Sequence, residues 1–539
     1  MNRRTTLARA AALLVSLPVG LAARAQPAGT PRLASSRGGT ALSAQGRFID
    51  QMIADYMERH GVPGLAMAIV QAPYIPRSAG YGRASLEHDE LAATRTLWNI
   101  GPITQGFTAV AIFQLVEAGK LALDDPIGKY LSALPAAWSG IALLQLLQHA
   151  SGLPDFRAAP GYEPGRARSP AELLALVADR PLTFAPGERV QRSATGFLLL
   201  GLVIERVSGV SYRDFVTRHQ IEPLGLRATM FASDFAARAA PDRPATPAGK
   251  QHSRFKTELA FINPVEPATG YGVADGRPVA RDAAGSTGLG AFGALWASAE
   301  DISVWDIALA SGLLVRREDN RARLYGPTRL ANGTVVPAMA GWEFTRHPGF
   351  MEIKGSAPGF SAYLSRFTAP DDLVCVTLLA NKEGLDLTDL ARDIATAYKT
   401  DLGPPSGAPG VLSRESKFTV DETVSRLETA LKAQNVPVFA SFDHAENAKA
   451  ADLTLRPTKV LVFGTPRVGT KLMQDSQAIG LDLPLRVAVW QDERGRVWIS
   501  HHDLDGLANR YGVTDEATVQ AMVQGVARLV ARAADVYAD

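Results

Sequence analysis

Residues 97–120 read LWNIGPITQGFTAVAIFQLVEAGK, and this stretch decides the fold. Its apolar residues recur at helical spacing and Gly119 supplies a C-terminal stop, so the stretch predicts a helix. Pro102 suits the first helical turn, where the N–H that it lacks would be unpaired anyway. The residues that share the predicted apolar face are Phe107, Val110, Ala111, Gln114, Leu115 and Ala118.

The chain around this helix has 539 residues, which predicts two or three domains. Hydrophobic residues make up 46% and charged residues 20%, as in a globular protein with a substantial core. The formal net charge is +2 and no basic cluster is present, so we expect no nucleic-acid partner. Cys375 is the only cysteine, which excludes an internal disulfide and a metal site built from cysteines.

Residues 1–25 are typical of a signal peptide, with a basic start, an apolar stretch and the small-x-small pattern at Ala23–Ala25. Arg3 and Arg4 are compatible with twin-arginine export as well as with the general secretory (Sec) route. The alternative is an amphipathic N-terminal helix of the mature fold. Residues 26–44 predict a flexible leader. No other run reaches the roughly 18 apolar residues of a membrane span, so we expect a periplasmic or secreted bacterial protein.

Composition and periodicity divide the rest of the chain into two domains. Residues 45–400 form the larger one, and the Gly- and Pro-rich residues 401–415 predict a linker to a small domain at 416–539. In the larger domain we expect a strand at 65–70, helix at 289–311 and a β-hairpin at 361–380. Residues 234–285 are expected to form an insertion that leaves the core as an excursion or lid. In the small domain we expect strands near 436–439, 459–463, 485–489 and 497–500, then a helix from about Thr514.

The larger domain contains five blocks that resemble one family when taken in order. They are residues 97–127, LLQHASGLPDF at 146–156, PGERVQRSATGF at 186–197, GAFGALWASAEDISVW at 290–305 and GSAPGFSA at 355–362. Together they resemble the serine hydrolases that include the class C β-lactamases and the penicillin-binding proteins. The resemblance implies an α+β fold: an antiparallel sheet with flanking helices, plus an all-helical part.

The same resemblance implies three catalytic elements, and this sequence departs from the family at each of them. A nucleophilic Ser begins the helix, and a Lys follows one turn later on the same face. A Tyr-x-Asn motif moves protons, and a His-x-Gly or Lys-x-Gly strand supplies a charge and an oxyanion-hole amide. Members of such a unit fail together, so no ordinary acyl-enzyme route fits. The positions hold Pro102 for Ser, Gln105 for Lys, Arg192 for Tyr, Ala194 for Asn and Ile353 for the His or Lys.

Other candidate nucleophiles have simpler explanations. Ser253 and Lys256 form an exact Ser-x-x-Lys, but they lie in the Pro-rich excursion, and one such pair is expected by chance in a chain of this length. Thr104 should turn away from the pocket, and Ser193 has the plain interpretation of a loop hydroxyl. His149 is expected to hold its turn rather than to catalyse.

Arg192, Lys354 and Gly355 are the candidate ligand-binding residues. Arg192 and Lys354 should face the former catalytic cleft, where their charges would suit an anionic ligand. The alternative is a salt bridge or a solvated rim. A closed, apolar cleft would favour a scaffold, whereas an open cleft with both cations converging would favour anion binding.

A second resemblance covers residues 416–539; the stretch at 442–503 carries it, and its most specific parts are FGTP at 463–466 and GLDLP at 480–484. They resemble a small bacterial α+β family of unknown function, family 302. The resemblance implies a compact fold that often pairs with itself, and it implies no reaction. We expect no cofactor. Weak candidates for a metal site are His444, His501 and His502, and the alternative is that they are surface or capping histidines.

Together these observations favour a catalytically silent hydrolase homologue that serves as a binding or interaction module. Its ligand would be a peptide, a cell-wall fragment or an anionic small molecule. One alternative is an active esterase, amidase or peptidase that uses non-standard residues. Another places the function in the C-terminal domain, through which the chain would self-associate, with the larger domain as its scaffold.

Overall fold

The computed structural model describes residues 40–71, 74–164, 166–235, 265–282, 289–345, 349–368, 374–404 and 408–537, with side chains from Phe48 onward in the first helix. The expected signal peptide, the Ser253–Lys256 pair and most of the expected excursion lie outside the described residues. Helix α1 (Thr40–His60) begins inside the segment expected to be the leader.

An eight-stranded antiparallel sheet forms the centre of the larger domain, in the order β11-β12-β13-β14-β15-β1-β2-β3. The expected strand at 65–70 and the hairpin at 361–380 are confirmed by β1 and by β14 with β15. The bounds are β11 Ala338–Met339, β12 Trp342–Phe344, β13 Phe350–Ala357, β14 Phe360–Phe367, β15 Val374–Ala380, β1 Gly64–Gln71, β2 Tyr74–Ser85 and β3 Glu90–Leu91.

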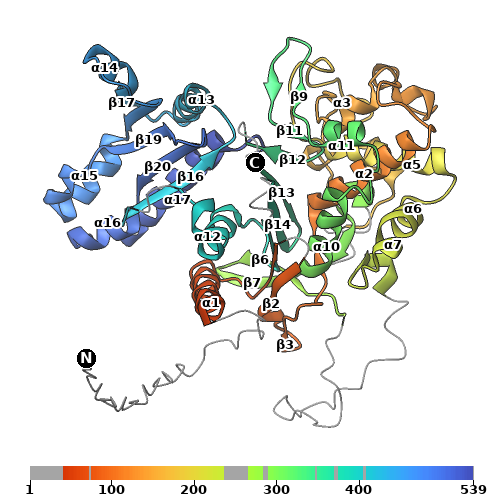
Figure 1. The fold of residues 1–539 in the computed structure, drawn as a ribbon, viewed down its shortest axis with the longest axis horizontal. Helices are drawn as coiled ribbons and strands as arrows, with labels where there is room; N and C mark the ends of the chain where they lie inside the picture. The colour runs from red at the N-terminus through yellow and green to blue at the C-terminus, as the bar shows by residue number, and fades with distance from the viewer. Residues whose placement is uncertain are drawn as a thin grey trace, which may run out of the picture.

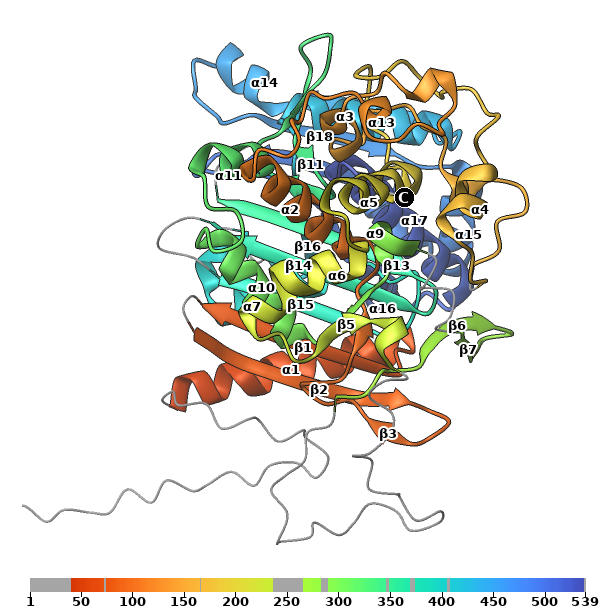
Figure 2. The ribbon, with the colours of Figure 1, turned by 90° about the vertical axis from the view of Figure 1, so that its right-hand side faces the viewer.

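Successive side chains of β1 point to opposite faces of this sheet and enter two separate cores. Leu65, Met67 and Ile69 pack in one core with α1 and α12 (Thr388–Tyr398). Ala66 and Ala68 face the other core, which contains the helical part of the domain. Figures 1 and 2 show α1 and the helical part on opposite sides of the sheet.

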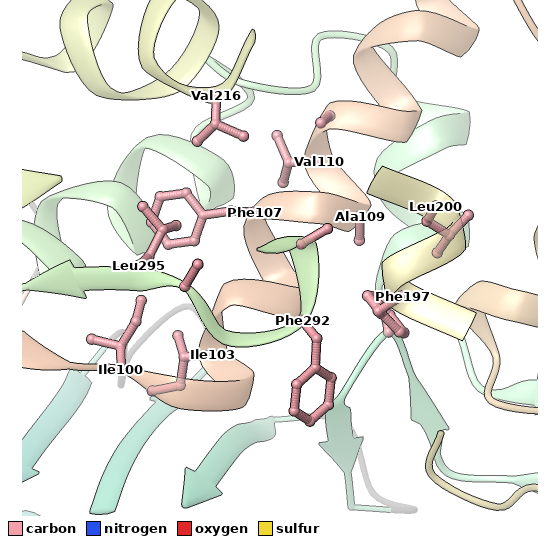
Figure 3. Close-up of a cluster of buried hydrophobic side chains, with 14 of the residues drawn as sticks. Ile100, Ile103, Phe107, Ala109, Val110, Phe197, Leu200, Val216, Phe292 and Leu295 are labelled. Carbon is pink, nitrogen blue, oxygen red and sulfur yellow. The ribbon is translucent and has the colours of Figure 1, made fainter. Parts of the chain in front are cut away.

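Helix α2 (Thr104–Glu117) lies at the centre of the helical part, and nearly all of its residues are buried. Figure 3 shows Phe107 pointing toward Leu295, with Phe197 and Leu200 of α5 (Ala194–Ser208) on the other side of α2. The Phe107 ring also stacks on Trp305 of α10 (Ala299–Ala310), with 4.1 Å between the ring centroids. The predicted helix is confirmed, and its burial on all sides explains why its apolar residues are not confined to one stripe.

We expected residues 289–311 to be helical, and this prediction is wrong in part. Strand β8 (Leu295–Ala297) separates α9 (Gly290–Gly293) from α10. Strand β8 lies between β4 and β5, so its backbone hydrogen-bonds two partners that are distant in the sequence. The other short elements are β4 Trp98–Asn99, β5 Thr229–Phe231, β6 Gly270–Ala274, β7 Arg277–Arg281, β9 Thr328–Arg329, β10 Val335–Val336, α3 Leu143–Leu147, α4 Pro170–Ala175, α6 Tyr212–Val216, α7 Glu222–Leu224, α11 Glu318–Leu324, η1 Gly101–Ile103, η2 Ile127–Lys129, η3 Ala136–Trp138, η4 Phe156–Ala158, η5 Thr217–Ile221, η6 Ala232–Asp234 and η8 Thr400–Leu402.

Across the described ranges, no single helix is both long and apolar enough to cross a membrane. Helix α5 and the segment Tyr212–Leu224 meet the criteria of length and composition only as a pair, and that pair is bent by 76°.

The C-terminal domain has a five-stranded antiparallel sheet in the order β16-β20-β19-β18-β17, which confirms the expected α+β fold. Strand β16 (Val411–Ser416) pairs with β20 and lies mostly within the expected linker, so the connection between the domains is shorter than predicted. The other elements are β17 Val438–Asp443, β18 Thr458–Phe463, β19 Leu485–Gln491, β20 Val497–His502, α13 Val420–Ala433, α14 His444–Ala450, α15 Pro466–Asp475, η9 Gln477–Leu481, α16 Leu504–Tyr511 and α17 Glu516–Ala534.

Candidate functional site

Pro102 stands where the family resemblance places a nucleophile, in η1 directly before α2. It is buried, and it packs against Gly355 of β13. A Cβ atom added to Gly355 would lie 2.3 Å from Pro102 Cδ, closer than real Cβ contacts allow. The proline ring therefore fills the space next to the strand, and not even a methyl group fits between them.

Gln105, one turn further along α2, is fully buried and pairs with His149. The His149 Nε2 atom lies 3.2 Å from Gln105 Oε1, and His149 Nδ1 accepts from the Ser193 amide at 3.3 Å. This network fits a neutral ring that donates from Nε2. Burial lowers the pKa of His149 well below its usual range, and Arg192 and Arg157 lower it further. Both ring nitrogens thus have partners, as expected of a histidine that holds its turn.

Ile353, at the position of the motif's His or Lys, is fully buried and belongs to the core around α2. A Cβ atom on Gly341 would lie 3.2 Å from Ile353 Cδ1 and 2.6 Å from Gln105 Oε1. The structure therefore brings Gln105 and Ile353 together, as the alignment predicts, around a closed and largely apolar centre.

Arg192 and Ala194 lie at the entrance to helix α5. Arg192 Nη2 donates to the backbone oxygen of Lys354 at 3.2 Å, and the guanidinium lies over the ring of Tyr537 at 4.6 Å from the centroid. The Ala194 amide donates to Asp155 Oδ2 at 3.1 Å. Between them, Ser193 Oγ is buried and has no hydrogen-bond partner among the described residues.

Tyr537 occupies the side of this site that Arg192 faces, and it belongs to residues 535–537, which we call the tail. The tail follows α17, which Figure 1 shows in the C-terminal domain, and its Val536 amide donates to Glu343 of β12 in the larger domain. Tyr537 is 6% exposed, and its ring meets His149 edge-on with 5.5 Å between centroids. Burial raises the pKa of the Tyr537 phenol, although Arg192 opposes the shift.

The position of the tail was not predicted from the sequence. Residues 535–537 read Asp-Val-Tyr and carry no motif. The two family resemblances describe the domains separately, so neither indicates that the last residues of one domain enter the cleft of the other. The one available signal was an aromatic residue a few positions after a predicted amphipathic helix.

We expected Lys354 to face the cleft beside Arg192, and this prediction is wrong. Successive residues of β13 alternate between faces, and Ile353 takes the cleft side. Its ammonium instead meets Asp535 Oδ2 at 2.6 Å. Burial disfavours the charge of Asp535, but Arg414, Lys354 and Lys417 outweigh it and hold the pKa of the carboxyl well below its usual range. Gly355 supplies the contact with Pro102 rather than an open amide site.

Three buried carboxylates, Glu343, Glu352 and Asp535, lie close enough together to suggest a metal site, with ligand atoms within 4.8 Å of one another. Their positive partners are the ammonium groups of Lys354 and Lys417, which both contact Glu352 and Asp535. Burial opposes the charge of Glu352, yet Lys417 and Lys354 lower its pKa to about 2. The lysines therefore already supply the charge that a cation would bring.

The structure does not bring the three candidate histidines together. His444 is exposed at the start of α14, after β17, whereas His501 and His502 lie in β20, and β18 and β19 separate these strands. His501 Nδ1 lies 2.8 Å from the backbone oxygen of His502. Burial lowers the pKa of His501, although the contact with His502 opposes the shift.

Comparison with known proteins identifies relatives of both domains. Residues 49–399 match the family described as Beta-lactamase, and residues 412–530 match Domain of unknown function DUF302. Penicillin-binding protein 4* of Bacillus subtilis is 24% identical over 375 residues, which cover 68% of this chain and 78% of that protein. A further similarity, 35% identity over 189 residues, covers 33% of this chain and 72% of the fluoride-specific ion channel FluC 1 of Brucella suis.

Solved structures share the fold at low sequence identity. The octameric penicillin-binding protein homologue from Pyrococcus abyssi has a TM-score of 0.55 at 21% identity, covering 84% of this chain and 89% of its own. The D-amino acid amidase from Ochrobactrum anthropi SV3 has a TM-score of 0.53 at 20% identity, covering 66% and 99%. A class C β-lactamase has a TM-score of 0.53 at 18% identity, covering 69% and 100%.

Proposed function

The chain belongs to the β-lactamase family of serine hydrolases and carries a C-terminal DUF302 domain, and from this premise we propose that it is a catalytically silent member kept as a binding module. The observation that carries the proposal is the packing at the nucleophile position. Pro102 offers no nucleophilic atom, and its ring packs so closely against Gly355 that an added Cβ atom would not fit.

The neighbouring groups support the same proposal. Gln105 takes the position of a lysine and neither ionises nor accepts a proton usefully, while Ile353 carries no charge. Loss of one nucleophile from a catalytic unit costs about 10⁶-fold in subtilisin, and such effects do not add, because the members act together. A chain that lacks every member of the unit has no partial route left.

A working hydrolase is the competing proposal, and one observation favours it. Ser193 Oγ is buried without a partner among the described residues, and the Ser193 amide contacts a neutral histidine, His149. However, it is the amide of Ser193 and not its hydroxyl that meets His149 Nδ1, so the hydroxyl has no base to activate it.

Covalent labelling by active-site probes separates the two proposals. A fluorescent penicillin and a fluorophosphonate should leave the full-length chain unlabelled in a gel and unchanged in intact mass. Penicillin-binding protein 4* treated in parallel serves as the positive control. A covalent adduct that disappears in Ser193→Ala or Thr104→Ala would overturn catalytic silence.

We also propose that residues 1–25 direct export and that the mature protein begins near Gln26 in the periplasm or outside the cell. The basic start and the Ala23–Ala25 pattern support this proposal. N-terminal sequencing of protein from the periplasmic fraction should begin close to Gln26. Full-length protein in the cytoplasmic fraction would contradict export.

A further inference from the structure

Residues 535–537 are held by a separate contact at each position, and the last of these contacts lies in the former cleft. Asp535 meets Lys354 of the larger domain at 2.6 Å. The Val536 amide donates to Glu343 Oε2 at 2.6 Å. Tyr537 lies under the Arg192 guanidinium and beside His149. The larger domain thus contacts an acidic side chain, a backbone N–H and an aromatic ring in succession.

The aromatic ring enters a place that the larger domain builds itself. Arg192 comes from the block that resembles the family's Tyr-x-Asn motif, and His149 from the LLQHASGLPDF turn. His149 is 1% exposed and neutral, so it offers an apolar edge, while Arg192 provides a cation over the ring face. A cation over an aromatic face contributes roughly 0.5–2 kcal/mol, more as the pair is desolvated.

The acidic anchor is equally specific. Asp535 is 1% exposed and accepts from Lys354, Arg414 and Lys417. A neutral residue at this position would leave three cations without their shared anion. The tail therefore crosses from the α12 face of the sheet, where Lys354 lies, to the cleft face, where Tyr537 lies. Separate groups thus contact the carboxylate of Asp535 and the ring of Tyr537.

We propose that the former catalytic cleft is a receptor site for a peptide segment with an aromatic residue two positions after an acidic one, and that the chain's own residues 535–537 are its resident ligand. This inference rests on the proposed binding function and names its ligand class. A peptide in solution competes with a tail of the same chain, whose effective concentration is in the millimolar range for a short connection. Wild-type protein therefore binds such a peptide weakly, and loss of the tail's aromatic ring strengthens the binding.

The test uses the full-length chain and a fluorescein-labelled peptide with the sequence of residues 533–539, Ala-Ala-Asp-Val-Tyr-Ala-Asp. Fluorescence anisotropy should show at least a tenfold lower Kd for Tyr537→Ala than for wild type. The gain should vanish when the peptide's Tyr is replaced by Ala, and also when Arg192→Ala is added to Tyr537→Ala. A folded Tyr537→Ala protein whose Kd for the peptide equals that of wild type would overturn the inference.

A second measurement keeps the inference testable if Tyr537→Ala does not fold. Cys375 is buried, so a dye attached to Ala538→Cys reports on the tail in an otherwise intact chain. Saturating unlabelled peptide should change the emission, and the Tyr-to-Ala peptide should not. No difference between the two peptides would contradict a receptor site. A negative result in either peptide experiment would not contradict the proposed catalytic silence. Covalent labelling by a probe would contradict the proposed function whether or not the peptide binds.

Discussion

Pro102 and Gly355 determine what the site can do at the scale of single residues. The ring of one lies where the other has room only for a hydrogen atom. The missing hydroxyl at Pro102 supports the proposed catalytic silence, and the close contact fixes the proline ring against the strand. The two residues form one structural feature, although they are far apart in the sequence.

Gly355→Ala should destabilise the fold, because the new methyl would lie 2.3 Å from Pro102 Cδ. Overpacking of this kind costs about 1–3 kcal/mol. Urea denaturation should show the loss, and adding Pro102→Ala should recover part of it by removing the ring atoms. Gly140→Ala is the matched control, since nothing lies within 4 Å of its added Cβ. Equal stability of Gly355→Ala and wild type would contradict the packing described here.

Asp535→Asn should destabilise the protein and change its response to acid. Removing one partner of a buried ion pair costs about 3–5 kcal/mol. The folded pKa of Asp535 lies well below its ordinary 3.8, so its contribution is complete above that value and is lost as the pH falls toward the folded pKa. As the pH is lowered from 5 to 2, the unfolding temperature should therefore decrease less steeply for Asp535→Asn than for wild type.

Asp319→Asn is the control for that experiment, because Asp319 pairs with Arg317 at the exposed surface. Its unfolding temperature should follow the wild-type curve at every pH. Parallel curves for Asp535→Asn and wild type would show that the buried carboxylate does not carry the acid dependence.

At the scale of elements, the sequence predicted those parts whose signals are local. The helix within 97–120, the hairpin at 361–380 and four of the small domain's strands were recognised from apolar periodicity and turn residues, whereas Trp98–Asn99 forms strand β4. Strand β8 was missed because its three residues, Leu295–Ala297, adopt strand geometry through pairing with β4 and β5. Only tertiary contacts distinguish such a short apolar run from helix.

The parts of the site that lie in recognisable family motifs could be predicted, because their signals are also local in the sequence. Gln105 and Ile353, which hold the positions of two of the family's catalytic residues, lie close together in the structure. The orientation of Lys354 was predicted wrongly, although the alternation of β13 around Ile353 was enough to place it on the other face. The tail could not be predicted, because its contacts join residues of two domains and no local pattern encodes them.

Tyr537 tests whether the tail is held by its ring. Tyr537→Phe keeps the ring that contacts Arg192 and His149, so its stability should stay close to that of wild type. Tyr537→Ala should cost about 3–5 kcal/mol, as for other large buried aromatic side chains. Chemical denaturation of the two variants measures the difference. Equal stability of the Ala and Phe variants would mean that the ring does not anchor the tail.

At the scale of the whole molecule, buried ion pairs join the two domains. Lys417 of the C-terminal domain meets Glu352 of β13, and Arg392 of α12 meets Glu415 of β16 at 2.9 Å. Glu352, Lys417 and Glu415 are all nearly inaccessible to solvent. Buried charges need their partners, so each domain completes the electrostatics of the other. This docking brings the tail to the cleft.

Lys417→Met should therefore uncouple the domains. The substitution leaves Glu352 and Asp535 short of a cation, and calorimetry should show lower stability, with the single transition splitting into two. Lys459→Met is the matched control: Lys459 also contacts two carboxylates, of Asp421 and Asp443, but is partly exposed and lies within the C-terminal domain. A single, unshifted transition for Lys417→Met would contradict a shared electrostatic interface.

The most direct test of catalytic silence removes the tail's ring and asks whether chemistry returns. Intact-mass measurement of Tyr537→Ala after prolonged fluorophosphonate treatment should show no added mass, because Pro102, Gln105 and Ile353 offer no nucleophile that could displace fluoride from the probe's phosphorus, even in an uncovered cleft. Covalent modification that is absent from Tyr537→Ala/Ser193→Ala would contradict this account and identify the tail as an inhibitor of an active hydrolase.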